Sequence, residues 1–117
     1  MPELIEQPTL IPVPGGKTIE EFVGRVNSND EKVSVAVMHA PAGWSEPAQT
    51  PEFDEFTIVL SGSIEVEHDG GSTLVKANQA IITRAGERVR YLTKENAHYV
   101  AICLPAFDMD LVNREED

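Results

Sequence analysis

Residues 54–77 read DEFTIVLSGSIEVEHDGGSTLVKA, and they contain three short segments rich in β-branched residues. Turn-forming residues separate these segments, first at Ser61-Gly62 and then at Asp69-Gly70-Gly71. An Asp-Gly pair between two such segments is a strong signal for a β-hairpin. The stretch therefore predicts consecutive antiparallel strands.

Similar segments lie on both sides of this stretch. Strands are predicted within residues 32–40, 79–86, 88–93 and 97–105, because each range is rich in apolar residues and ends at turn-forming ones. Residues 17–26, KTIEEFVGRV, fit either a short helix capped by Thr18 or a first strand. Roughly six or seven short strands with turns about every 8–12 residues predict an all-β sandwich or barrel with little helix.

The chain of 117 residues is expected to form one domain. We predict an extended arm and a first short element over 1–32, the barrel over 33–105, and an acidic tail over 106–117 that frays. The N-terminus lacks the basic and long apolar segments of a signal peptide. Apolar runs such as 99–104 are too short to span a bilayer. We therefore expect a cytoplasmic protein without a membrane partner.

The net charge of −11 argues against a nucleic acid partner, because phosphate binding needs clustered cations. Basic residues do gather at Arg84, Arg88 and Arg90. We expect these arginines to pair with surface carboxylates, with an anion site as the alternative. The single cysteine, Cys103, lies in an apolar run, which favours a packed thiol over a nucleophile.

Residues 43–62 carry a spaced pattern of glycines and polar residues. Gly43 is followed after five residues by Gln49-Thr50-Pro51, then after three more by Glu55, and after six more by Gly62. This spacing resembles the first motif of the cupin superfamily, in which His-x-His occupies positions 49–51. A degenerate second motif, in which only the glycine matches the family, lies at Asn78, Arg84, Gly86, Val89 and Thr93. The resemblance covers about residues 33–105 and implies a double-stranded β-helix, the cupin jelly-roll barrel.

In metal-bearing cupins, three histidines and the glutamate of these motifs bind a divalent ion. Carried over to this chain, the resemblance leaves Glu55 as a match and Gln49 as a weak oxygen ligand. Pro51 and Val89 offer no side-chain donor to a metal. We therefore predict no cofactor, and we keep a divalent metal held by Glu55, Gln49 and His39 as the alternative. The other side chains from which such a site can be rebuilt are Glu46, Tyr91 and His98.

The segments 52–66 and 86–108 are similar to the ethanolamine-utilisation branch of the cupins. Members of that branch also lack the metal-binding histidines and keep acidic residues in the barrel. Acetate kinase activity has been attributed to the branch. We do not transfer it, because this chain has no glycine-rich phosphate-binding loop.

Strand alternation separates the side chains of residues 54–61 into two sets. If Glu55 faces the interior, Thr57 and Val59 face it as well. Phe56, Ile58 and Leu60 then form an apolar row on the outside, which a small domain does not leave in water. Because cupins commonly pair through their sheets, we predict a homodimer. The proline-rich arm is a candidate for crossing to the partner subunit.

Glu55 is the centre of the predicted small-molecule site. Partial desolvation among Val, Thr and Tyr side chains raises the pKa of a carboxyl group toward the range of a general base. We predict Glu55 and Tyr91 as catalytic residues, the first as a base and the second as a proton donor. The predicted ligand-binding residues are Gln49, Thr57, Trp44 and Glu46.

Each of these residues also has a purely structural interpretation. Glu55 then forms hydrogen bonds to Gln49 and Tyr91 in a polar interior. Trp44 is expected to pack rather than to bind a ligand. We expect Glu46, Glu52 and Asp54 to be solvated loop acids, with Glu46 leaning over the barrel mouth as the alternative.

Three functions fit these residues. The first is a metal-independent isomerase or lyase, which needs a base, an acid and a polar anchor. The second is a non-catalytic cupin that binds or senses a small ligand, and the third is a metal-dependent enzyme with a rebuilt ligand set. A barrel that serves only as a dimeric scaffold is the least informative alternative. No Ser-His-Asp or Cys-His spacing points to covalent hydrolysis.

Overall fold

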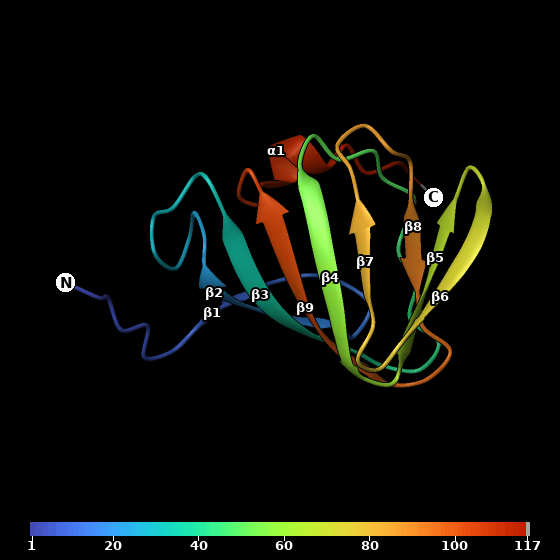
Figure 1. Cartoon of the computed structure of the whole chain (residues 1–117), viewed down its shortest axis with the longest axis horizontal. Helices are drawn as coiled ribbons and strands as arrows, with labels where there is room; N and C mark the ends of the chain where they lie inside the picture. The colour runs from blue at the N-terminus through green and yellow to red at the C-terminus, as the bar shows by residue number, and fades with distance from the viewer. Residues whose placement is uncertain (117) are drawn as a thin grey trace.

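The computed structural model describes residues 1–116, and its strands form two antiparallel sheets (Figure 1). The larger sheet has six strands in the order β1 (Thr9–Ile11), β2 (Thr18–Val23), β3 (Ser34–Ala40), β9 (Ala97–Leu104), β4 (Asp54–Ser61) and β7 (Ala80–Thr83). The smaller sheet has the order β6 (Gly71–Lys76), β5 (Ser63–His68) and β8 (Arg90–Leu92). The all-β jelly-roll architecture expected from the sequence is confirmed.

The predicted hairpin joins β5 and β6, with His68 opposite Gly71 at its turn. The ambiguous segment at 17–26 forms a strand rather than a helix. The reason is that β2 has a partner on each side, β1 through Ile11 opposite Ile19 and β3 through Met38 opposite Ile19. Hydrogen bonding on both edges outweighs a weak local helix propensity.

The alternation predicted along β4 is confirmed. Thr57 and Val59 are buried, whereas Ile58 is 40% exposed and Leu60 is 45% exposed on the other face. Val59 belongs to the main core between the sheets, together with residues from both. The other buried members of that core are Ala40, Trp44, Ile64, Val66, Val75, Val89, Tyr91, Ala97 and Tyr99.

The C-terminal segment was expected to fray, and this expectation is wrong for the described residues. A short helix, α1 (Met109–Val112), lies against the large sheet, and Val112 is fully buried beside Phe53 and Cys103. Arg88 then fixes the following residues through a bidentate pair with Glu115, at 2.6 and 2.8 Å. The segment docks because it supplies apolar side chains to a small second core.

The basic residues singled out in the sequence pair with surface carboxylates, as expected. Arg84 contacts Asp54 at 3.4 Å, and Arg90 contacts Glu67 at 2.8 Å. Within residues 1–116 no helix has the length and apolar character needed to cross a membrane.

Candidate functional site

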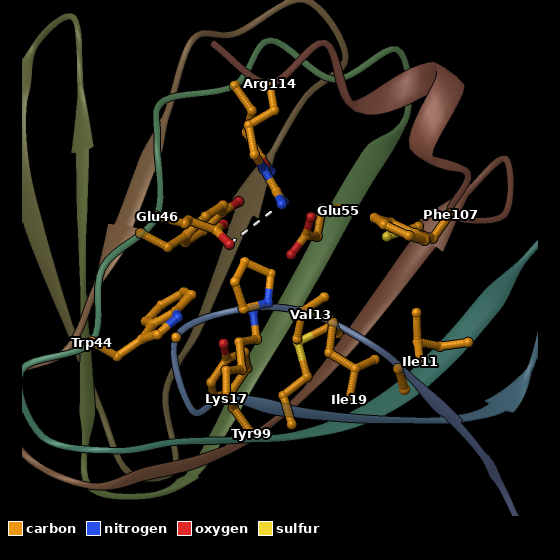
Figure 2. A pocket seen from close by; sticks show the side chains of 18 of the residues that line it. Ile11, Val13, Lys17, Ile19, Trp44, Glu46, Glu55, Tyr99, Phe107 and Arg114 are labelled. Atoms are coloured by element: carbon orange, nitrogen blue, oxygen red, sulfur yellow. Dashed lines mark hydrogen bonds and ion pairs between the residues drawn. The ribbon is translucent and has the colours of Figure 1, made fainter. Parts of the chain in front are cut away.

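A cavity of about 360 Å³ lies on the inner face of the large sheet. Its walls come from strands β1–β4, β8 and β9, from the loop 44–49, and from the C-terminal segment. The segment 11–17 runs along one side, so the N-terminal arm closes the cavity of its own chain (Figure 2). Such a volume suits a small molecule.

Glu55 projects into this cavity from β4, where it lies between Cys103 on β9 and Thr83 on β7. Thr57 donates a hydrogen bond to the Glu55 carboxylate at 3.4 Å. Burial raises the pKa of Glu55 to about 7, and the nearby Lys17 ammonium limits the rise. The carboxyl group therefore changes its charge near neutral pH.

Tyr91 lines the same cavity from β8, as predicted, and neighbouring Val89 is buried as well. The Tyr91 hydroxyl lies 3.1 Å from the Thr83 hydroxyl, which in turn lies 3.5 Å from the Glu55 carbonyl oxygen. Burial raises the pKa of Tyr91 well above its usual value, so the phenol stays neutral. Thr83, which the sequence did not single out, thus fixes the hydroxyl of Tyr91.

Gln49 is held by two backbone hydrogen bonds to Val89, at 2.8 and 2.9 Å. Its side-chain oxygen accepts a hydrogen bond from Nη2 of Arg114 at 3.0 Å. The structural interpretation in which Glu55 bonds to Gln49 and Tyr91 is therefore wrong. Gln49 engages Arg114, and Tyr91 engages Thr83.

Glu46 is a cavity residue rather than a solvated loop acid. Its side chain is 13% exposed and faces Arg114 Nη2 at 3.5 Å (Figure 2). The favoured expectation for Glu46 was wrong because the docked C-terminal segment brings a cation to it. Glu52 and Asp54 lie outside, as expected, where they contact Asn113 and Arg84.

Two cationic residues of the site were missed in the sequence, Lys17 and Arg114. Nζ of Lys17 lies 4.4 Å from the centre of the Trp44 ring and 5.4 Å from that of Tyr99. Burial lowers the pKa of Lys17, whereas Glu46 and Glu55 act to raise it. No sequence motif marks either residue, since both come from segments expected to lie outside the barrel.

The remaining predicted ligand-binding residues differ in their position. Trp44 both packs in the core and lines the cavity. Thr57 is 1% exposed and is not among the residues that line the cavity. Thr57 therefore supports Glu55 by a hydrogen bond. The structure does not place it on the cavity wall, where the predicted contact with a ligand would be made.

The positions that the cupin motifs define offer few ligands to a metal ion. Pro51 and Val89 are buried there without a donor atom. His39 lies on the outer face of β3, opposite His98, and the two rings stack 4.1 Å apart. Among residues 1–116 no three His, Cys, Asp or Glu side chains form a metal-binding group. The ligand set of Glu55, Gln49 and His39 is therefore wrong, because strand alternation turns His39 away from Glu55.

Several solved structures have a similar fold. An RmlC-like cupin from Shewanella frigidimarina has a TM-score of 0.75 at 13% identity, over 93% of this chain and 94% of that one. The polyketide cyclase RemF from Streptomyces resistomycificus has a TM-score of 0.78 at 16% identity, over 100% and 88%. A putative ethanolamine utilization protein EutQ from Salmonella typhimurium has a TM-score of 0.64 at 16% identity, over 86% and 98%.

Sequence comparison adds one curated relative, and no protein family model matches the chain. The relative is named Endoribonuclease YbeY, from Myxococcus xanthus, and is 43% identical over 108 residues. The match covers 91% of this chain but only 37% of the relative, so most of that protein lies outside it. The chain has the cupin fold, which it shares with these solved structures.

Proposed function

We propose that the chain is a small-molecule enzyme that uses Glu55 as a general acid–base group, without the three-histidine metal site of other cupins. The observation that supports this proposal is the position of Glu55 on the cavity wall, with a pKa of about 7 and the Lys17 ammonium nearby. A group with this pKa can both accept and return a proton near neutral pH.

The reaction class that fits these groups is proton transfer next to a carbonyl. The Glu55 carboxylate would take a proton from carbon, and the electron pair of that bond would move to the carbonyl oxygen. The Lys17 ammonium would stabilise the resulting oxyanion. Return of the proton to another carbon completes an isomerisation, whereas departure of a leaving group from the neighbouring carbon completes an elimination. Tyr91, fixed by Thr83, is the proposed second proton donor.

The cyclase named among the structural neighbours is consistent with small-molecule chemistry on this fold. We do not propose the activity in the name of the curated relative. The match leaves most of that relative uncovered, and a net charge of −11 disfavours binding to RNA.

Deuterium incorporation from heavy water tests the proposal directly. A panel of 2-oxo acids, hydroxy ketones and 1,3-dicarbonyl compounds is incubated with the protein and followed by proton NMR. We expect at least one compound to exchange, and we expect the exchange rate to fall by about 100-fold or more in Glu55→Gln. Glu52→Gln, which changes an exposed acid outside the cavity, should retain the wild-type rate.

The second candidate is a binding or sensing protein that turns nothing over. The apolar and aromatic share of the cavity wall favours it, because Trp44, Tyr99 and Phe107 provide contact surface without chemistry. If no compound exchanges faster with the wild type than with Glu55→Gln, the enzymatic proposal is rejected and this candidate replaces it.

We also propose that the chain forms a homodimer through the outer face of the large sheet. That face carries contiguous apolar side chains from β4, β7 and β9, since Phe56 lies opposite both Ile82 and Ile102, and Ile58 lies opposite Val100. Ile82 is 51% exposed. A second copy covering this face would remove the apolar patch from water.

A further inference from the structure

We propose that the cavity binds a small carboxylate, whose anionic group is held between Lys17 and Arg114 and whose apolar body lies against Ile11, Ile19 and Phe107. The inference names the ligand class of the site proposed above, and so it rests on that cavity being the functional site. Arg114 and Lys17 enter the cavity from opposite sides, and Ile11 and Phe107 lie together along a third side (Figure 2).

The first argument is the unfilled hydrogen-bonding capacity of Arg114. Its Nη2 contacts Gln49 at 3.0 Å and Glu46 at 3.5 Å, but its buried Nε has no partner within residues 1–116. A buried donor without an acceptor is costly and uncommon in proteins. The guanidinium of Arg114 therefore has hydrogen-bonding capacity that no group of the described chain fills.

The second argument is the environment of Lys17. Within the described part of the chain, no carboxylate oxygen lies within 4.0 Å of its Nζ, and the ring centres of Trp44 and Tyr99 lie 4.4 and 5.4 Å from it. An ammonium group has three donors and no acceptor of its own. Aromatic faces offset part of its charge but accept no strong hydrogen bond. Lys17 therefore presents free donors to the cavity.

The third argument is that the two cations destabilise each other. Burial is the largest cause of the lowered pKa of Lys17, and the charge of Arg114 adds to it, whereas Glu46 and Glu55 act to raise this pKa, each by more than Arg114 lowers it. An anion located between the two groups would relieve this repulsion and favour the charged form of Lys17. While Glu55 is protonated, the cavity therefore favours a further negative group, even though the whole chain is acidic.

A single negative charge fits this cavity better than two. Glu46 is already paired with Arg114, and Glu55 becomes negative as the pH rises through about 7. With Glu55 protonated, Lys17, Arg114 and Glu46 leave one net positive charge, which a carboxylate balances and a phosphate dianion exceeds. The planar carboxylate also matches the geometry of a guanidinium. The apolar side of the cavity then accommodates a short hydrocarbon body.

Trp44 provides a direct measurement of binding, because it is the only tryptophan in the chain and lines the cavity. Tryptophan fluorescence and isothermal titration calorimetry are recorded with hexanoate, hexanamide and hexyl phosphate. We expect hexanoate to bind at least about tenfold more tightly than the other two, since a buried charged hydrogen-bonded pair contributes about 1.5–3 kcal/mol. Calorimetry is needed because Lys17 contacts the Trp44 ring and alters its emission directly.

Variants separate the cation pair from general effects of charge. Lys17→Gln and Arg114→Gln should each lower the affinity for hexanoate by about tenfold or more and leave the affinity for hexanamide unchanged. Lys32→Gln removes an exposed lysine and should change neither of the two affinities. Lys17→Gln is the decisive variant, because the ammonium makes no hydrogen bond within residues 1–116 whose loss would unfold the protein.

Equal affinity for hexanoate and hexanamide, tighter binding of hexyl phosphate, or unchanged hexanoate affinity in Lys17→Gln would overturn the inference. These results are distinct from those of the deuterium exchange. Deuterium exchange that depends on Glu55, without a preference for carboxylates, would support the proposed enzymatic activity and reject this ligand class. A preference for carboxylates without deuterium exchange would support the proposed ligand class and reject the proposed enzymatic activity.

Discussion

Arg114 donates a hydrogen bond to the side-chain oxygen of Gln49 at 3.0 Å. Gln49 occupies the position of the first metal-binding histidine in the cupin motif, and Arg114 comes from the C-terminal segment, 65 residues later. The contact brings a fixed cation into the part of the barrel where metal-bearing cupins bring a metal ion.

Substitution of Glu55 should alter the pH dependence of folding. The pKa of Glu55 is about 7 in the folded protein and 4.5 in an ordinary environment, so the folded state binds the proton more tightly. Its contribution to stability is fully present below about pH 4.5 and is lost as the pH rises through about 7. We expect Glu55→Gln to gain about 3 kcal/mol relative to the wild type between about pH 4.5 and about pH 8.

Urea unfolding of both proteins across this pH range measures the difference. Lys17, Glu46 and Arg114 face the same cavity, and they are unchanged in the comparison. Glu52→Gln should keep the pH profile of the wild type. Parallel profiles for the wild type and Glu55→Gln would show that the carboxyl group has an ordinary pKa.

Val112→Ala tests whether the C-terminal segment is docked. Because Val112 is fully buried beside Phe53 and Cys103, we expect its truncation to lower the free energy of unfolding by roughly 2 kcal/mol. Met109→Ala, in the same helix but 57% exposed, should change it by less than about 0.5 kcal/mol. Urea unfolding measures both. A neutral effect of both variants would indicate a frayed segment.

The sequence predicted the framework of this molecule because strand signals are local. β-Branched segments, the Asp-Gly turn and the spacing from Gly43 to Gly62 lie in short stretches, and the structure confirms the strands they indicate. The same locality placed Glu55, Gln49 and Tyr91 on the cavity wall. Alternation within a strand is a short-range rule, and it held along β4.

The two cations of the site could not be predicted in this way. Lys17 reaches the cavity because the arm before it crosses the barrel, and Arg114 does so because α1 docks on Phe53 and Cys103. Both positions depend on contacts between segments distant in sequence. Glu46 was misjudged for the same reason, since its burial depends on Arg114. His39 lies opposite His98 on the outer face of the sheet, and strand periodicity alone does not assign that face.

Two motif glycines should differ sharply when each is replaced by alanine. Gly62 has a φ of +74°, and an added Cβ would collide with the backbone carbonyl oxygen of Asn96. Gly43 has a φ of +81°, but an added Cβ would meet nothing within 4 Å. We expect Gly43→Ala to cost about 1 kcal/mol and Gly62→Ala roughly 3 kcal/mol or more, measured by thermal or urea unfolding. Similar costs would mean that Asn96 moves aside.

The proposed dimer gives the last prediction. Ile58 lies in the apolar outer face of the large sheet, and replacement by arginine would place a charge within the buried interface. We expect Ile58→Arg to convert the dimer into monomers at micromolar concentration, measured by sedimentation equilibrium. Leu74→Arg is the matched control, because Leu74 is 52% exposed on β6 of the other sheet. An unchanged mass in Ile58→Arg, or a monomeric wild type, would reject this face as the interface. Since Ile58 points away from the cavity, its substitution should also leave hexanoate binding unchanged.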